Sequence, residues 1–193
     1  MILPTSVLDM IEEANDYYFP TLTGMYLKIS RTLITIATVF FTPLYLLYMQ
    51  NPQWLPDVFS FVMVRDQINL PLIWQFLLLE LSIDGLRLAA MNTPTMLSTP
   101  LSVIAGIVMG EFSVESGWFN SEVMLYMAFV AVANYTQPNF ELGYALKFMR
   151  LMLLVLTAVF NLYGFVLGCI LVLCFLVFNK TLSGRNYLNV KIN

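Results

Sequence analysis

Three charged side chains, Glu80, Asp84 and Arg87, stand in an otherwise apolar stretch that reads LELSIDGLRLAAMNTP from residue 79 to residue 94. On an α-helix their spacing places them within an arc of about 60°, so they form one polar stripe. In water such a stripe is an ordinary solvated face. In a bilayer a charge at mid-depth costs about 3 kcal/mol, so these side chains are then expected to face protein or a water-filled cavity.

Two roles fit this charged cluster of Glu80, Asp84 and Arg87. One is an ion pathway, or a polar latch between helices that changes when a channel opens. The other is a static ion pair that only supports assembly. The i,i+3 spacing lets Asp84 pair with Arg87, which leaves Glu80 as the freer acceptor.

Small residues form a second pattern, in which Ser98, Ser102, Gly106 and Gly110 recur every four positions and end in GIVMG. The same G-x-x-x-G spacing returns at residues 164–168. Such a ridge lets helix backbones approach closely, which favours helix association and oligomerisation. Small side chains also leave room for a pore lumen, and tight packing is the favoured of the two interpretations.

A helix expected at residues 120–135 presents Met127, Val130 and Asn134 on neighbouring faces. A ring of such helices would make a hydrophobic gate with a polar mouth at Asn134, because narrow apolar constrictions exclude water. Packing inside a helical bundle explains the same residues more simply.

Composition limits the class of protein. The chain has 193 residues, of which 59% are hydrophobic and 11% charged, against about 25% charged in soluble domains. It has no histidine, and Cys169 and Cys174 are spaced for different helix faces, so they are expected to pack rather than to bind metal. No phosphate-binding loop and no nucleophile with a base is present. A membrane protein without enzymatic activity, cofactor or nucleic-acid partner is therefore predicted.

Five apolar runs define the expected fold. Three are long enough to cross a bilayer, at residues 32–49, 70–91 and 151–178. Two are about half that length, at residues 101–109 and 123–133, and fit broken or re-entrant helices. A polar turn is expected at residues 111–122. The fold class is an all-α integral membrane protein, a polytopic bundle with about three full spans and two half-length helices.

Three regions follow from this pattern. Residues 1–31 form a polar juxtamembrane lead-in with a short surface helix, residues 32–178 the transmembrane domain, and residues 179–193 a polar C-terminal tail.

Polar residues at the ends and inside the runs also carry expectations. Lys28 and Arg31 precede the first run, and Lys147 and Arg150 precede the last, where they are expected to be basic anchors at the membrane surface. Asn161 lies inside the last run, where it is expected to hydrogen-bond to another helix.

Several blocks resemble the membrane half of the spore germination A-subunit family. The most specific are ELGYALKFMR and MAFVAVANYTQPN, and the similarity extends over nearly the whole chain. Two departures favour a sporulation paralogue over a nutrient receptor. Asp84-Gly85 is followed by Arg87-Leu88 where receptors have Glu-Ala-Gly and Arg-Leu-Pro, and Glu111 stands where they have glutamine.

The resemblance implies a protein of the inner spore membrane of an endospore-forming bacterium. It also implies a homo-oligomeric, pentameric channel that releases monovalent cations, together with other germination membrane proteins as partners. Residues 1–31 would then be the end of a preceding soluble domain. Two alternatives stay open: a non-conducting assembly or signalling partner, and a secondary transporter suggested by Pro94 and Pro100.

Overall fold

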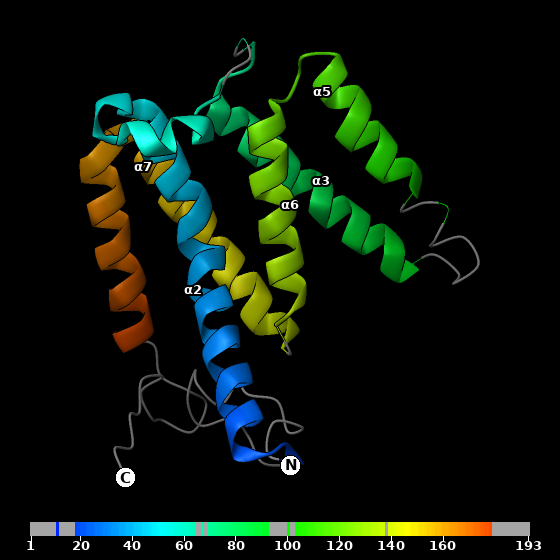
Figure 1. The fold of residues 1–193 in the computed structure, drawn as a ribbon, viewed down its shortest axis with the longest axis vertical. Helices are drawn as coiled ribbons and strands as arrows, with labels where there is room; N and C mark the ends of the chain where they lie inside the picture. Colours follow the sequence, from blue (N-terminus) through cyan, green and yellow to red (C-terminus); the bar gives the residue numbers. More distant parts are fainter. Residues whose placement is uncertain are drawn as a thin grey trace. The chain divides into compact units, whose positions relative to one another are not determined.

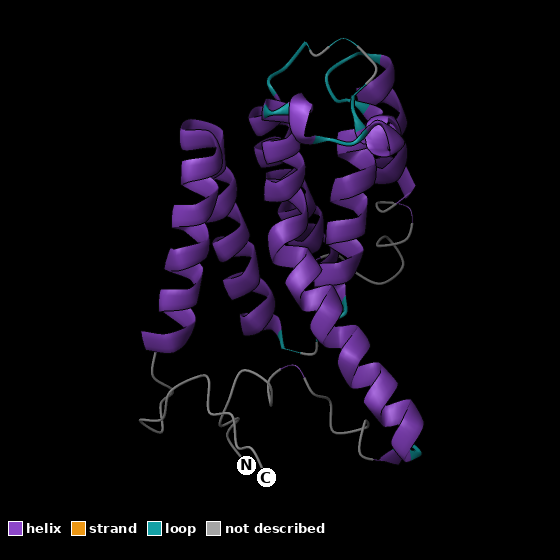
Figure 2. Cartoon of the chain, turned by 60° about the vertical axis from the view of Figure 1, so that its left-hand side comes forward, coloured by secondary structure: helices purple, strands orange, loops and turns teal. Residues whose placement is uncertain are grey.

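The protein is all helical in the part that its computed structural model describes, which is Ile11 and residues 18–64, 67, 69–92, 100, 103–137 and 139–178. Figure 2 shows helices and loops in these residues and no strand. The predicted all-α class is therefore confirmed. The predicted surface helix lies almost entirely outside the described residues, as do the C-terminal tail, Ser98 and Ser102.

The helices follow one another in this order (Figure 1): α2 (Thr21–Gln50), η2 (Pro52–Trp54), η3 (Asp57–Val62), α3 (Leu72–Asn92), the π-helix η4 (Ile107–Phe112), α5 (Ser113–Glu115), α6 (Ser121–Tyr135) and α7 (Phe140–Phe178). They belong to two compact units. Unit 1 comprises Met1–Pro43 and Val132–Asn193, and unit 2 comprises Leu44–Ala131.

Within unit 1, α7 is a hairpin rather than the single uninterrupted helix expected for residues 151–178. Its backbone leaves the helical region at Asn161, with φ 55° and ψ −131°. Figures 1 and 2 show arm 140–160 and arm 162–178 lying side by side and running in opposite directions. A positive φ is uncommon for any residue but glycine, and a ψ of −131° lies outside the left-handed α region that asparagine adopts most often, so the tight turn imposes a strained backbone at this position. Asn161 therefore lies at the turn of the hairpin and takes part in an interaction there, and its expected hydrogen bond to another helix stays a prediction.

Glycines bring the two arms of this hairpin into close contact. A Cβ on Gly164 would collide with the main-chain carbonyl of Leu156, and a Cβ on Gly168 would lie 2.7 Å from Leu153 Cδ2. The close packing predicted for residues 164–168 is therefore confirmed, and the surface that they pack against is the preceding arm of the same helix.

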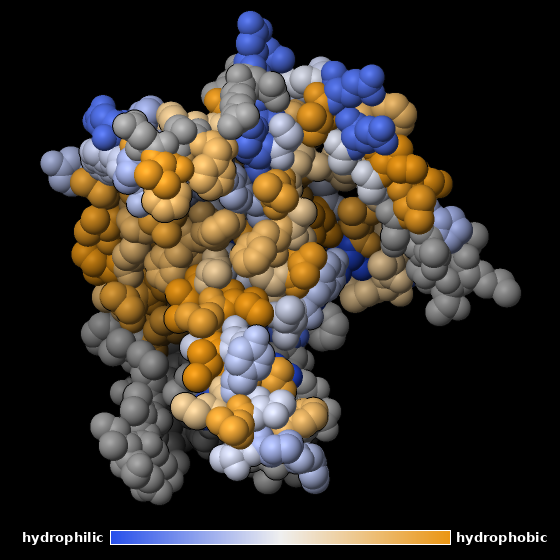
Figure 3. All heavy atoms as spheres, in the orientation of Figure 1, coloured by the Kyte–Doolittle hydropathy of each residue, from blue (hydrophilic) through white to orange (hydrophobic). Residues whose placement is uncertain are grey.

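The core of unit 1 lies between α2 and the hairpin. Its buried members are Ile11, Val39, Leu142, Leu146, Met149, Leu153 and Val172. Cys169 packs partly against this core as predicted, whereas Cys174 is exposed, and both thiols are free. The outer face of arm 162–178 is apolar and exposed, as Figure 3 shows; it includes Val166, Leu167, Ile170, Leu171, Leu173 and Phe175.

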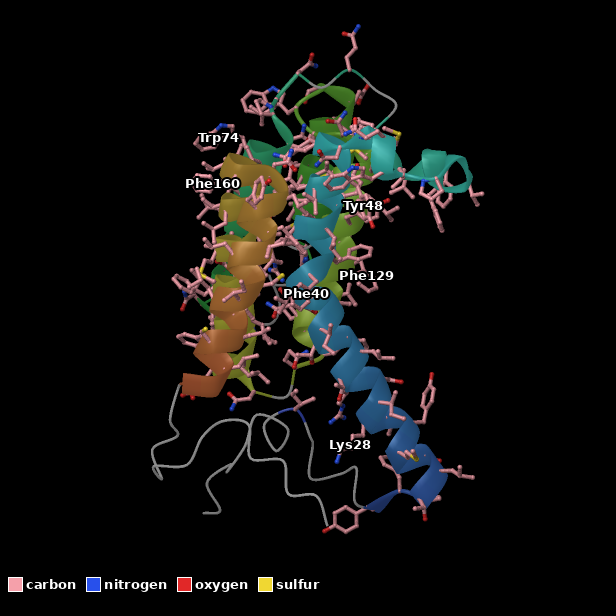
Figure 4. All side chains as sticks on the ribbon, turned by 90° about the vertical axis from the view of Figure 1, so that its left-hand side faces the viewer. Lys28, Phe40, Tyr48, Trp74, Phe129 and Phe160 are labelled. Carbon is pink, nitrogen blue, oxygen red and sulfur yellow. The ribbon has the colours of Figure 1, made fainter. Side chains whose placement is uncertain are left out.

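Two helical segments of the described chain are long and apolar enough to cross a membrane, judged by length and composition. They are Thr21–Gln50, of 30 residues, and Glu141–Leu176, of 36 residues. Figure 4 shows Lys28 in the first turns of α2 and Phe160 beside the turn of α7. Because α7 reverses at Asn161, each arm has to be considered separately, and arm 140–160 is about 30 Å long at 1.5 Å per residue.

In unit 2, the helix that follows α3 is longer than predicted. It runs through residues 103–115, including η4 and α5, whereas a polar turn was expected to begin at Glu111. The turn is confined to residues 116–120 and contains Gly117 at φ 73°. We refer to this segment as the 103–115 helix.

Candidate functional site

The charged cluster lies on α3 of unit 2, as its spacing predicts. Glu80 is only 5% exposed, and Asp84 and Arg87 are half-buried. Each of the three takes part in an electrostatic or hydrogen-bonding interaction, so the expectation that Glu80 is a free acceptor is wrong. A carboxylate held this deep in an apolar helix is sheltered rather than solvated, which is the arrangement expected for an intramembrane charge.

A buried amide pair, which the sequence reasoning missed, holds the starts of α3 and α6 together. Gln75 Nε2 donates to Asn120 Oδ1 at 2.7 Å, and the backbone N–H of Asn120 donates to Gln75 Oε1 at 2.9 Å. Gln75 Nε2 also donates to the carbonyl of Leu70 at 2.7 Å. A glutamine among apolar residues at the start of a helix was the only signal in the sequence. This pair joins the start of α3 to the start of α6. The charged cluster lies further along α3, so the pair helps to fix the position of the helix that carries it.

Replacing Gln75 by alanine is expected to lower the free energy of unfolding by about 2 kcal/mol, because both the side-chain Oδ1 and the main-chain N–H of the buried Asn120 lose their bonds to Gln75. Chemical denaturation of the purified chain in detergent measures this. The matched control is Gln53→Ala in the exposed η2 turn, for which we expect a change within about 0.5 kcal/mol. Equal effects of the two substitutions would show that the amide pair does not stabilise unit 2.

The small-residue ridge is open where the structure describes it. An added Cβ on Gly106 or on Gly110 would meet no atom of the described chain within 4 Å. The 103–115 helix also exposes large apolar side chains: Val103, Ile104, Ile107, Val108 and Phe112. The close packing favoured from sequence is therefore not made within the described part of the chain. The π-helical turns at Ile107–Phe112 coincide with this ridge, and such turns are frequent at functional sites.

The gate residues predicted on α6 point mainly inward. Met127 and Val130 are buried and Asn134 is half-buried. The large hydrophobic side chains that the same helix exposes are Leu125, Phe129, Val132 and Tyr135. A hydrophobic gate formed by Met127 and Val130 stays a prediction, and in this conformation both side chains contribute to packing.

Unit 1 contains a buried basic pair that corrects the predicted surface anchors. Arg150 is 2% exposed and Lys147 is 6% exposed, and both lie inside α7, which begins at Phe140 rather than at residue 151. Arg150 Nη1 donates to the main-chain carbonyl of Thr38 on α2 at 3.1 Å. Charged groups in a protein interior need such partners, because losing water without replacement is costly.

Other polar groups of α2 accompany this pair. Gln137 Nε2 donates to the hydroxyl of Thr35 at 2.9 Å, one turn before Thr38. Thr42 Oγ1, one turn after Thr38, is buried and has no hydrogen-bond partner among the described residues. Pro43 removes the N–H that would bond to the carbonyl of Val39. The carbonyl of Val39, which lacks this main-chain donor, directly follows the Thr38 carbonyl that Arg150 contacts.

The charged cluster of α3 and the basic pair of α7 offer ion pairs and hydrogen bonds. Among the described residues, no group of three or more His, Cys, Asp or Glu side chains is placed to hold a metal ion. The described chain is all helical, and two of its segments are long and apolar enough to cross a membrane, which fits the predicted membrane protein.

A sequence profile of the family described as "Bacillus/Clostridium GerA spore germination protein" matches residues 1–193. The chain belongs to this family of spore germination proteins. The family predicted by resemblance is therefore confirmed. No solved structure matches the chain.

Several relatives show where in the family the chain lies. It is 35% identical to stage V sporulation protein AF of Bacillus subtilis over 168 residues, which is 87% of this chain and 34% of that protein. It is 27% identical to spore germination protein GerQA of Bacillus cereus over 191 residues, 96% of this chain and 38% of that protein. An uncharacterized membrane protein of B. subtilis, YfkQ, is 24% identical over 87% of the chain and 33% of its own length. The chain spans about a third of the length of these relatives.

Proposed function

We propose that this germination protein is a subunit of a homo-oligomeric, pentameric ion channel in the inner spore membrane, where it releases monovalent cations during germination. Family membership supplies the process. The observation that carries the channel proposal is the 103–115 helix, whose open glycines and exposed apolar side chains need neighbours that the described chain does not provide. In a ring of identical copies, this helix would meet its counterparts or line the lumen.

Exposed tryptophans support the membrane setting of the proposal. All three tryptophans of the chain, Trp54, Trp74 and Trp118, are exposed and belong to unit 2. They lie in η2, near the start of α3 and in the turn before α6. The last two of these segments are tied together by the Gln75–Asn120 pair and by a 3.0 Å bond from Asn69 Nδ2 to the Gly117 carbonyl. Tryptophan is enriched at the membrane–water interface, so this end of unit 2 is proposed to lie there.

The charged cluster provides the proposed polar path. In this proposal Glu80 attracts cations, and its deep position on α3, where it already takes part in an interaction, supports a sheltered charge. Neutralising a carboxylate on such a path lowers cation flux, because the attraction that draws ions into the low-dielectric region is lost.

A non-conducting assembly or signalling role is the second candidate. It is favoured by the fact that Glu80, Asp84 and Arg87 are all engaged in interactions, which fits a static structural cluster. In that case the 103–115 helix would bind another germination membrane protein instead of further copies of this chain.

Cation efflux from liposomes that contain the purified chain tests the channel directly. We expect Glu80→Gln to lower K⁺ efflux about tenfold and Gly106→Leu to abolish most of it, since leucine fills the open face of the 103–115 helix. Glu141→Gln on α7 and Ala128→Leu on α6, both at exposed positions outside the 103–115 helix, are the matched controls and should leave efflux within about twofold. Unchanged efflux in both Glu80→Gln and Gly106→Leu would remove these residues from the conducting path.

The mass of the detergent-solubilised protein separates the two candidates. A ring of identical copies is expected, and Gly110→Leu should shift it toward the monomer because the helix backbones can no longer approach closely. The assembly role would instead be supported by a monomer that co-purifies with a different membrane protein, provided that the Gly110→Leu variant no longer binds that protein.

A further inference from the structure

Two buried oxygen atoms in unit 2 have no hydrogen-bond partner among the described residues. They are the hydroxyl oxygen of Tyr45 on α2 and Oε2 of Glu122 in the first turn of α6. Tyr45 is only 5% exposed as a residue, so its hydroxyl group is cut off from bulk water. Buried polar atoms are nearly always paired, and a buried carboxylate oxygen is among the most costly to leave unpaired.

These two oxygens belong to one site. The ring of Tyr45 packs on the ring of Tyr126 with centroids 4.3 Å apart, and Tyr126 lies one helical turn after Glu122 on α6. The charge of Glu122 acts on the hydroxyl groups of both tyrosines. The edge of Phe76 on α3 closes the other side of Tyr45, with ring centroids 6.1 Å apart. Three helices of unit 2 therefore surround a carboxylate and a phenol hydroxyl with aromatic walls.

The geometry points to a binding site for one small monovalent metal cation, with Glu122 Oε2 and the Tyr45 hydroxyl as oxygen ligands and Tyr126 beside them. Hard cations prefer oxygen ligands, and one carboxylate balances one positive charge. A direct hydrogen bond from the Tyr45 hydroxyl to Glu122 would satisfy both atoms, but the two atoms do not make it. A cation between them would be coordinated by both.

The neighbouring structure makes the site rigid. Asn120, two residues before Glu122, is held by Gln75, which precedes Phe76. The Gln75–Asn120 bonds therefore hold the backbone beside Glu122 on α6 and the backbone beside Phe76 on α3 in fixed positions. Tyr45 lies about one and a half turns before the end of α2, at the end of unit 2 where the tryptophans are exposed. The choice of a monovalent cation rests on the proposed channel function, for which this site would be a binding station near one mouth.

Thermal unfolding of the purified full chain in an uncharged detergent tests the site. KCl, NaCl or methylammonium chloride is titrated against choline chloride at constant ionic strength. We expect a saturable rise in melting temperature with K⁺ or Na⁺. Glu122→Gln should raise the midpoint of this titration about tenfold or more, and Tyr45→Phe about threefold. The matched controls Glu115→Gln and Tyr48→Phe, both at exposed positions, should leave it unchanged.

Three results would overturn the inference. Equal stabilisation by choline would mean that the cations act only as salt. No dependence on any cation would mean that a water molecule alone satisfies the two oxygens. A shift with methylammonium but with neither metal ion would mean that the site binds an ammonium group. If Glu122→Gln does not fold, two further measurements test the cation site. Tyr45→Phe removes one oxygen ligand and keeps the ring, and equilibrium dialysis of Rb⁺ measures binding to the wild-type protein.

Binding and conduction are separable in this design. Saturable K⁺ binding by a protein that passes no ions in liposomes would contradict the channel and retain the site. Ion flux through a protein that binds no K⁺, or whose K⁺ midpoint is unchanged in Glu122→Gln, would contradict the site and retain the channel.

Discussion

Gly164→Ala is expected to lower the free energy of unfolding by about 3 kcal/mol or more, because an added methyl group has no room between the two arms of α7. The added Cβ would collide with the main-chain carbonyl of Leu156 in the opposite arm of α7. A main-chain carbonyl inside a helix cannot rotate away as a flexible side chain can. The two arms would have to separate, which would also weaken the packing of Gly168 against Leu153.

Chemical denaturation in detergent measures this effect, and Gly85→Ala on α3 is the matched control. A Cβ on Gly85 would meet no described atom within 4 Å, so alanine should be neutral or stabilise α3 by up to about 1 kcal/mol. If both alanine variants behaved alike, the close hairpin at Asn161 would be incorrect.

Arg150→Ala is expected to cost about 3 kcal/mol, the second large effect. The substitution removes the charge-assisted hydrogen bond to the Thr38 carbonyl and leaves a space beside α2, where the long side chain had filled the interior of unit 1. The same denaturation assay applies. Lys28→Ala, at an exposed position on α2, is the control and should change stability by less than about 0.5 kcal/mol.

Arg150→Met separates the two contributions to this effect. Methionine keeps much of the volume and removes the guanidinium group, so a cost well below that of alanine would assign most of the effect to packing. An Arg150→Ala variant as stable as Lys28→Ala would show that Arg150 is solvated, as a surface anchor would be.

Helix type and approximate position could be predicted from the sequence wherever an apolar run had a clear boundary. α3 follows directly from its run and carries the charged cluster on one face as its spacing requires. α2 ends where its run ends but begins at Thr21, eleven residues before the predicted start at residue 32. The hairpin could not be predicted, because Asn161 is a weak turn signal within a continuous apolar run and no proline marks the reversal. The spacing of Gly164 and Gly168 indicated close packing, but it did not identify the arm against which they pack.

The buried basic pair escaped prediction for a different reason. A Lys-x-x-Arg spacing before an apolar run is typical of membrane anchors, and nothing in the sequence distinguishes it from a buried pair. The acceptor of Arg150 is a main-chain carbonyl 112 residues away, and a carbonyl group is present at every residue type. Tyr45 and Glu122 are also far apart in sequence, so their meeting required the fold.

The candidate sites divide in the same way. The position of Glu80 on one buried helix face was predictable from periodicity alone. The sequence could not predict whether Gly106 and Gly110 pack against this chain or against another one. An apolar helix face has the same composition in both cases.

Recording of currents across a planar bilayer after fusion of vesicles that contain the purified full chain tests the central claim most directly. Under a K⁺ gradient with choline as the replacing cation, the account predicts discrete unitary currents that reverse near the K⁺ equilibrium potential. Folded, oligomeric protein that gives no more current than empty vesicles would contradict the proposal that this chain forms a cation channel.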